Sequence, residues 1–238
     1  MDSSPTFQQA AWRRLKKNKG AVLGLVVIVL SVLVAVFAYF IAPDSSPYAN
    51  RIILEIGGEK PGSSREFVKV KKEKDVEATG FFARLASGKE DKYYYVPITA
   101  HVIKGDSIIV QKYIDEGLTE RIAYPLSQKA PAPVVKMKFI TGTDKYGRDI
   151  LSRIIVGTRV SLSVGLITVI ISLSIGLLLG SLAGFYRGKT DEVIMWFINV
   201  IWSIPTLLLV FAITLALGKG FWQVFIAVGL TMWVNVAR

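Results

Sequence analysis

The sequence predicts an all-α polytopic membrane protein that carries a small β-rich extracytoplasmic insert. Three observations predict this fold class. Hydrophobic residues make up 52% of the 238 residues, and the mean hydropathy is +0.45. These residues are concentrated in four long uncharged blocks. Between the first two blocks, residues 43–141 are instead rich in charges of both signs, with Pro and Gly at intervals.

The four uncharged blocks are predicted to be membrane spans, because a bilayer core about 30 Å thick needs roughly 20 apolar helical residues. They lie near residues 20–42, 160–186, 193–218 and 221–237, and the last is the shortest. We expect the first span to be an uncleaved anchor. It is longer than the apolar core of a signal peptide, and Phe40 stands where a small residue would precede a cut.

The net charge of +11 would suit a nucleic-acid-binding protein, but basic residues that flank spans have another cause, the positive-inside rule. The tail 1–19 is basic, which predicts that it lies in the cytoplasm. Four spans then place the loop 187–192 inside and the insert 43–141 outside. We therefore expect a multi-pass protein of the cell (inner) membrane, with membrane lipid and not nucleic acid around it.

The insert 43–141 is expected to be rich in β-structure and, without any cysteine in the chain, to be held by packing alone. A tight hairpin turn is predicted at Gly105-Asp106. Strands are predicted at 51–56, 66–72, 93–104 and 107–113, and a short helix at 81–86. The expected role of the insert is a spacer or docking surface, with a ligand sensor as the alternative.

No catalytic, cofactor-binding or metal site is predicted, so the chain is not expected to be an enzyme. The glycines of 57–62 are spaced like a phosphate loop, but the lysine that must follow the last glycine is missing. His101 is the only histidine and has no cysteine beside it, which makes it a poor metal ligand.

The second predicted span carries a stripe of small residues spaced four apart, which are Ser172, Gly176, Gly180 and Gly184. Residues at this spacing share one face of a helix, and small side chains let two helix backbones approach closely. We interpret the stripe as a helix-packing face, although glycine is also common in membrane helices generally.

The third predicted span contains Ser203 and Pro205, and a proline within a span removes a backbone hydrogen bond and usually kinks the helix. Both residues are candidates for lining a pathway, and a purely structural kink is the alternative. No ionisable side chain lies well inside any predicted span. Ion-coupled carriers need such groups as relays, so energy for transport is expected from a partner.

Residues 142–158 are predicted to form an amphipathic helix in the outer membrane interface that leads into the second span. Apolar residues recur there at helical spacing, at Ile150, Leu151, Ile154 and Ile155. Asp144 and Arg148 are four apart, as are Asp149 and Arg153, which permits weak ion pairs on a helix surface.

The same segment carries a family resemblance. Its motif residues are Gly142, Thr143, Asp144, Gly147, Arg148 and Asp149. They closely resemble the segment that precedes the permease domain in dipeptide and oligopeptide ABC importers. Residues 12–19, 157–162, 184–192, 203–206 and 233–238 are similar to that family as well.

The resemblance implies a type-1 ABC importer permease with a cytoplasmic N-terminus and six spans, carrying peptides, nickel or related small solutes. The implied partners are a second homologous permease, two cytoplasmic ATPase subunits and an extracytoplasmic binding protein. It also implies a coupling loop and two further spans after Arg238, so we expect 159–238 to be a partial domain and the sequence a fragment or an interrupted gene. A membrane-anchored sensor and a non-transporting scaffold subunit are the alternatives.

Overall fold

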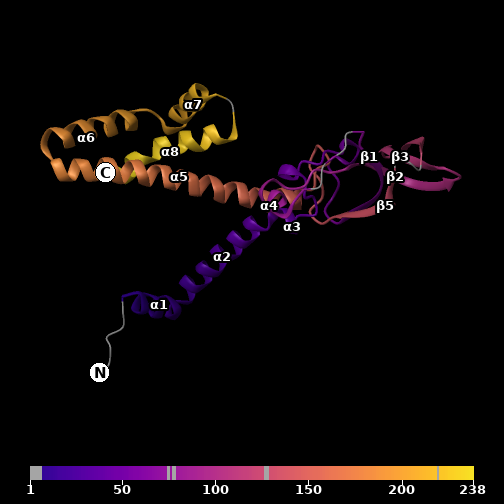
Figure 1. Ribbon diagram of the computed structural model, residues 1–238, viewed down its shortest axis with the longest axis horizontal. Coiled ribbons are helices and arrows are strands. Elements are labelled where there is room, and N and C mark those ends of the chain that lie inside the picture. The colour runs from indigo at the N-terminus through magenta and orange to yellow at the C-terminus, as the bar shows by residue number, and fades with distance from the viewer. Residues whose placement is uncertain (1–6, 74–75, 77–78, 126–128, 219) are drawn as a thin grey trace. The chain divides into compact units, whose positions relative to one another are not determined.

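The computed structural model describes residues 7–73, 76, 79–125, 129–218 and 220–238 (Figure 1). The chain separates into two compact units, the first ending at Arg159 and the second beginning at Val160. The first unit contains three N-terminal helices and the insert. The second unit consists of helices, beginning within a long helix that starts in the first unit.

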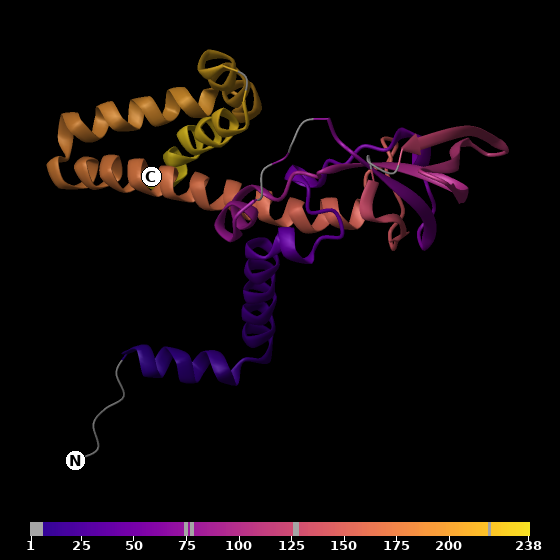
Figure 2. The same ribbon diagram turned by 45° about the vertical axis from the view of Figure 1, so that its right-hand side comes forward.

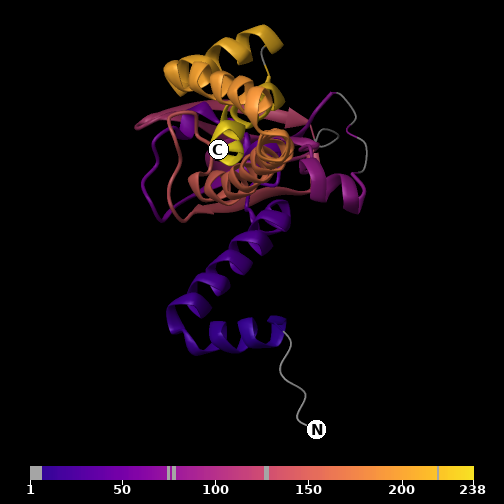
Figure 3. The ribbon, with the colours of Figure 1, turned by 90° about the vertical axis from the view of Figure 1, so that its left-hand side faces the viewer.

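The N-terminal helices are α1 (Phe7–Lys17), α2 (Lys19–Val36) and α3 (Ala38–Ile41). Figure 3 shows α1 and α2, both in indigo, meeting at an angle. At this joint the Asn18 side chain caps α2 by accepting a hydrogen bond from the Ala21 N–H at 3.1 Å. After Lys19, α2 is uncharged and almost wholly apolar, and most of its 18 residues are not covered by protein, which suits a helix surrounded by lipid.

The insert is built on a five-stranded antiparallel sheet in the order β4-β3-β2-β1-β5. Its strands are the arrows in Figure 2. A short helix, α4 (Phe81–Ser87), lies between the first and second strands in the order of the chain. The strands are β1 (Ser63–Lys71), β2 (Tyr93–Lys104), β3 (Ser107–Asp115), β4 (Leu118–Pro125) and β5 (Lys129–Phe139).

Each face of the sheet contributes to a separate hydrophobic cluster, as two adjacent residues of β1 show. Phe67 and Val68 are each fully buried, and neighbouring side chains of a strand point to opposite faces. Phe67 packs with Ile53, Ile56 and Phe139, whereas Val68 packs with residues of the other strands. Val134 of β5 and Tyr124 of β4 both border the Val68 cluster, although their strands form the two edges of the sheet.

The structure confirms part of the predicted insert and corrects the rest. The Gly105-Asp106 hairpin turn and the helix near 81–86 are confirmed. The strand predicted at 51–56 is wrong, because Leu54–Ile56 forms a 3₁₀ turn. Ile53 and Ile56 are three apart and pack into one cluster, a spacing that a 3₁₀ turn places on one side but a strand does not. Strands β4 and β5 were not predicted.

The remaining helices are α5 (Ile150–Tyr186), α6 (Gly188–Ser203), α7 (Thr206–Leu217) and α8 (Phe221–Ala237). Among the described residues, α2 and α5 are each long and apolar enough to cross a membrane, and α6 with α7 would make a third span. These two helices are bent by 97°, so the predicted span 193–218 is broken and not a single kinked helix. The predicted span 221–237 corresponds to α8, a shorter apolar helix.

The amphipathic helix predicted over 142–158 is also corrected. Helix α5 begins only at Ile150 and continues without a break to Tyr186. Its 37 residues make it about 55 Å long, more than the roughly 30 Å of a bilayer core, so part of it must lie outside the hydrocarbon. Val156, near its start, packs in the first unit with Tyr39 and Ala42.

Candidate functional site

The family motif folds as a closed loop directly before α5. Thr143 and Asp149 pair as an isolated antiparallel bridge, and the Ile150 N–H donates to the Gly142 carbonyl at 3.2 Å. The backbone at Gly142 and Gly147 has φ of +80° and +71°, which no α-helix contains. These two left-handed positions explain why the helix starts at Ile150 and not at the predicted residue 142.

Asp144 closes the loop from inside. Its Oδ1 accepts hydrogen bonds from the N–H groups of Tyr146 (2.9 Å) and Arg148 (3.1 Å), while its Oδ2 lies 2.6 Å from the Arg148 guanidinium. Partial desolvation opposes ionisation, but the bonds from Arg148 and the two backbone donors outweigh it and lower the pKa of Asp144. The predicted Asp144–Arg148 ion pair is therefore present, but it closes a turn of the loop and does not lie on a helix surface.

The second predicted pair is replaced by other contacts. Arg153 lies near Asp144, with its Nε 3.9 Å from Oδ2. The Asp149 carboxylate instead accepts from the Ser152 N–H at 2.8 Å and from the Ser152 hydroxyl. Asp149 is buried and precedes the first helical residue, so it acts as the N-cap of α5.

The two motif glycines lie against the backbone of the segment that follows the first helices. A Cβ at Gly147 would collide with the carbonyl oxygen of Ile53, and one at Gly142 with that of Glu59. Both conformation and contact therefore require glycine. The loop is thus fitted to residues 53–59 by direct backbone contact.

Thr143 fastens the same contact with its side chain. Its buried hydroxyl donates to the Ile56 carbonyl at 2.5 Å and accepts from the Glu59 N–H at 2.9 Å. The Gly58 N–H donates to the Asp144 carbonyl at 3.0 Å. These bonds satisfy buried polar groups that would otherwise each cost free energy.

A buried relay ties the chain after α3 to the start of α5. The Asp44 N–H donates to the Ser152 hydroxyl at 2.8 Å, and that hydroxyl donates to the Asp149 carboxylate. The Asp44 carboxylate accepts from the N–H groups of Ser46 (2.9 Å) and Arg51 (3.0 Å). Sequence reasoning did not find the contact between Asp44 and Ser152, because the two residues are 108 positions apart in the chain.

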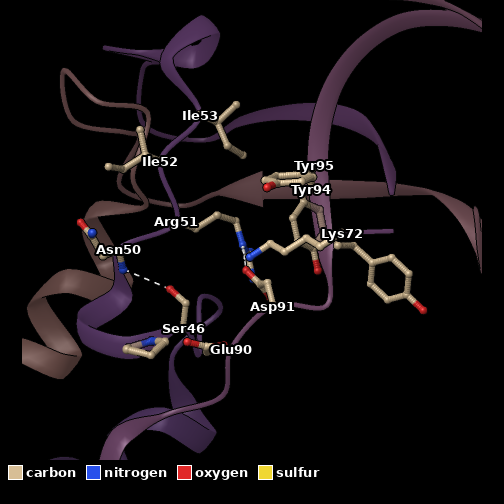
Figure 4. Close-up of a pocket in the computed structure, with 12 residues that line it drawn as sticks. Ser46, Asn50, Arg51, Ile52, Ile53, Lys72, Glu90, Asp91, Tyr94 and Tyr95 are labelled. Atoms are coloured by element: carbon tan, nitrogen blue, oxygen red, sulfur yellow. Dashed lines mark hydrogen bonds and ion pairs between the residues drawn. The ribbon is translucent and has the colours of Figure 1, made fainter. Parts of the chain in front are cut away.

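A pocket of about 410 Å³ lies next to this relay, at the ends of β1 and β2 (Figure 4). Arg51 forms two bonds to Asp91, at 2.6 and 2.9 Å, and its guanidinium lies over the Tyr95 ring at 4.2 Å. Burial opposes protonation, but Asp91 and Asp44 raise the pKa of Arg51. Lys72, Glu90 and further tyrosines line the remaining wall. The Arg51 cation is therefore paired with a carboxylate within the pocket.

The small-residue stripe of α5 lies partly against α8 in the second unit. A Cβ on Gly176 would stand 2.5 Å from the Val236 Cβ, and one on Gly180 would stand 2.7 Å from the Ala237 carbonyl oxygen. Ser172 is buried, whereas a Cβ on Gly184 would meet nothing within 4 Å. The first three stripe residues are therefore covered, and Gly184 faces open space.

Ser203 and Pro205 lie at the break between α6 and α7. The exposed Ser203 hydroxyl donates to the Val200 carbonyl at 2.7 Å, and Leu209 donates to the Pro205 carbonyl to start α7. A cavity of about 80 Å³ beside the break is lined by residues of α6, α7 and α8, among them Trp202, Thr206 and Asn235. The structure places both predicted residues at the bend.

Two family models match the chain, one at each end. Residues 6–54 match the N-terminal TM domain of oligopeptide transport permease C. Residues 176–238 match the binding-protein-dependent transport system inner membrane component. This second description, together with the apolar helices α2 and α5, makes the chain a multi-pass protein of the inner membrane.

Individual relatives agree with these models. A dipeptide transport system permease of Lactococcus lactis subsp. cremoris is 30% identical over 234 residues, covering 98% of this chain and 56% of the relative. The chain therefore spans little more than half the length of that protein. An oligopeptide transport system permease of Bacillus subtilis is 41% identical over 97 residues, 41% of this chain and 32% of the relative.

A glutathione transport system permease of Pectobacterium atrosepticum is 43% identical over 89 residues, 37% of this chain and 30% of the relative. The matches thus include both ends of the chain and, in the Lactococcus protein, nearly all of it. They identify the chain as a relative of the dipeptide and oligopeptide permease subunits of binding-protein-dependent transport systems.

Proposed function

We propose that this chain forms part of the permease subunit of an ATP-driven ABC importer, which carries peptides or related small solutes across the cytoplasmic membrane. One observation carries the proposal, the similarity to a dipeptide permease that continues through 98% of the chain. The alignment includes the segment between the two family-model matches, so it supports one protein of this kind and not a fusion of unrelated parts.

In this proposal the motif loop is a structural joint. It holds the segment after the first span, residues 44–59, against the start of α5 through glycine contacts, the Thr143 hydroxyl and the Asp44–Ser152 relay. The insert is thereby fixed to the helix that leads into the next span. Gly176 and Gly180 of the stripe pack α5 on α8, and the break at Ser203-Ile204-Pro205 is a candidate flexing point of the pathway.

The partners are a second homologous permease, two cytoplasmic ATPase subunits and an extracytoplasmic binding protein. The uncharged interiors of the predicted spans support an external energy source, because they offer no relay for protons or ions. The pocket beside Arg51 gives no specific support to a ligand sensor, since its Arg51 guanidinium is already bound to Asp91 and lies near Asp44.

The orientation follows from the basic tail. We place residues 1–19 in the cytoplasm, 20–42 across the membrane, 43–141 outside, and the partial transmembrane domain from 159 onward. Because the chain has no cysteine, single cysteines at Trp12 and Tyr94 can be probed with a membrane-impermeant thiol reagent in intact cells. Labelling at 94 alone is expected, and labelling at 12 instead would refute this orientation.

The function is tested by ATP hydrolysis in the assembled complex. The polypeptide that carries this sequence is reconstituted in nanodiscs with the second permease, the ATPase subunits and the binding protein. ATP hydrolysis should rise severalfold when peptide-loaded binding protein is added, and only when this permease is present. An equal rate of ATP hydrolysis with and without this subunit would contradict the assignment.

A further inference from the structure

Helix α1 has two chemically distinct sides. At 100° per residue, Phe7, Ala11 and Leu15 fall on one side, with Trp12 at its border. The rest of the circumference carries the basic residues Arg13, Arg14, Lys16 and Lys17. No acidic residue lies between Phe7 and Lys17. The helix therefore combines an apolar arc, interrupted only by Gln8, with an arc in which every charged residue is basic.

The joint at Asn18 holds α1 close to a membrane span. The Asn18 N–H donates to the Leu15 carbonyl at 3.1 Å, and the Val22 N–H donates to the Asn18 carbonyl at 3.0 Å. Only one residue separates the two helices, and α2 is uncharged after Lys19. The 11 residues of α1 extend about 16 Å, so the whole helix stays near the surface at which α2 enters the membrane.

Most of the apolar arc is uncovered in the part of the chain that the structure describes, where Phe7, Ala11 and Trp12 are exposed and Leu15 is half-buried. Phe7 is 89% exposed and Trp12 is 52% exposed. The Lys16 ammonium lies 5.3 Å from the centre of the Trp12 ring, which brings a cation to the border of the two arcs. Tryptophan and lysine at such a border suit the level of lipid headgroups, where an aromatic ring meets both water and acyl chains.

We propose that α1 lies on the membrane surface and binds anionic phospholipid headgroups. Its apolar arc faces the acyl chains, and its four cations meet lipid phosphates. Charge complementarity and the joint with α2 favour lipid over a protein as the occupant, because basic residues next to a span are attracted to an anionic surface wherever they can reach it. The bound helix would fix the depth at which α2 begins.

The first test compares the two sides of α1 in the full chain. Ala11→Cys and Gln9→Cys lie about 160° apart on the helix at 100° per residue, and each is the only cysteine. Each is labelled with an environment-sensitive fluorophore in nanodiscs of phosphatidylcholine, with or without phosphatidylglycerol. The label at 11 should be severalfold better protected from iodide than the label at 9. This protection should increase with phosphatidylglycerol and weaken in 1 M salt, where the Debye length is about 3 Å.

The second test removes the charge. A variant with Arg13, Arg14, Lys16 and Lys17 changed to Gln should lose the dependence on phosphatidylglycerol. A control with Lys71, Lys89, Lys92 and Lys104 changed to Gln should keep it. Equal quenching at positions 9 and 11 would overturn the proposal. Protection of the label at 11 that changes neither with phosphatidylglycerol nor with the loss of the four charges would overturn it as well. So would protection that arises only when an ATPase subunit is added. Neither test uses a transport substrate or ATP, so a failure here is distinct from a failure of the proposed function.

Discussion

The Ser152 hydroxyl accepts a hydrogen bond from the Asp44 backbone N–H at 2.8 Å, across 108 positions of the chain. The same hydroxyl donates to the Asp149 carboxylate, and all three residues are buried. This short relay connects the end of the first apolar segment to the first turn of α5. The proposed role of the motif loop as a structural joint depends on such contacts.

Ser152→Ala should destabilise the first unit, since it leaves the Asp44 N–H without its partner and removes one donor from Asp149. A buried group left unpaired costs about 1–3 kcal/mol. The measurement is the midpoint of thermal unfolding in detergent. Ser174→Ala, which removes an exposed hydroxyl bound within α5, is the control and should change the midpoint little. Equal midpoints for both variants would show that the relay does not contribute to stability.

Gly147→Ala should destabilise the protein more than Gly105→Ala does. Both glycines have positive φ, so both substitutions carry the cost of a left-handed alanine, about 1–2 kcal/mol. Only at Gly147 would the new methyl group collide with a backbone carbonyl, whereas Gly105 has open space around it. Thermal midpoints of the two variants isolate this contact. A loss at Gly147 no larger than at Gly105 would mean that the loop can move away from Ile53 without cost.

The stability that the motif loop contributes to the fold should fall in acid, because the pKa of Asp144 is lowered in the folded state. Its ionised form then contributes stability that is fully present above the ordinary value of 3.8 and is lost as the pH falls through the lower folded value. The thermal midpoint of the wild type should therefore fall below about pH 4, and Asp144→Asn should flatten that fall. Asp106→Asn, in the hairpin turn, is the control and should keep the wild-type slope. If Asp144→Asn kept the wild-type slope of thermal midpoint against pH, ionisation of Asp144 would not contribute to the loss of stability in acid.

Gly180→Leu should disrupt the packing of α5 on α8, whereas Gly184→Leu should be tolerated. A side chain at Gly180 would meet the Ala237 backbone, and one at Gly184 would meet open space. The change in free energy is expected to exceed the 1–3 kcal/mol typical of overpacking, since backbone and not a flexible side chain is displaced. Protease resistance of α8 in detergent is the readout. Similar resistance in both variants would show that the stripe is not a tight interface.

The sequence predicted the parts of the fold that depend on composition and local turns. The uncharged stretches of α2 and α5 were found from length alone, and Gly105-Asp106 marked the hairpin because a tight turn needs those residue types. The loop at 142–149 was mistaken for helix, because Asp144 and Arg148 are four apart and that spacing also closes a turn. The Asp44–Ser152 contact could not be predicted, since nothing local in either segment specifies a partner so distant in the chain.

The proposed function requires that solute uptake be driven by ATP hydrolysed on partner subunits. The most direct measurement is uptake of radiolabelled peptide by proteoliposomes that contain the polypeptide carrying this chain, the second permease, the ATPase subunits and the binding protein. Uptake is expected only when ATP is supplied to the ATPase side, because the predicted spans contain no ionisable relay. Uptake driven by a proton gradient in the absence of ATP would contradict it.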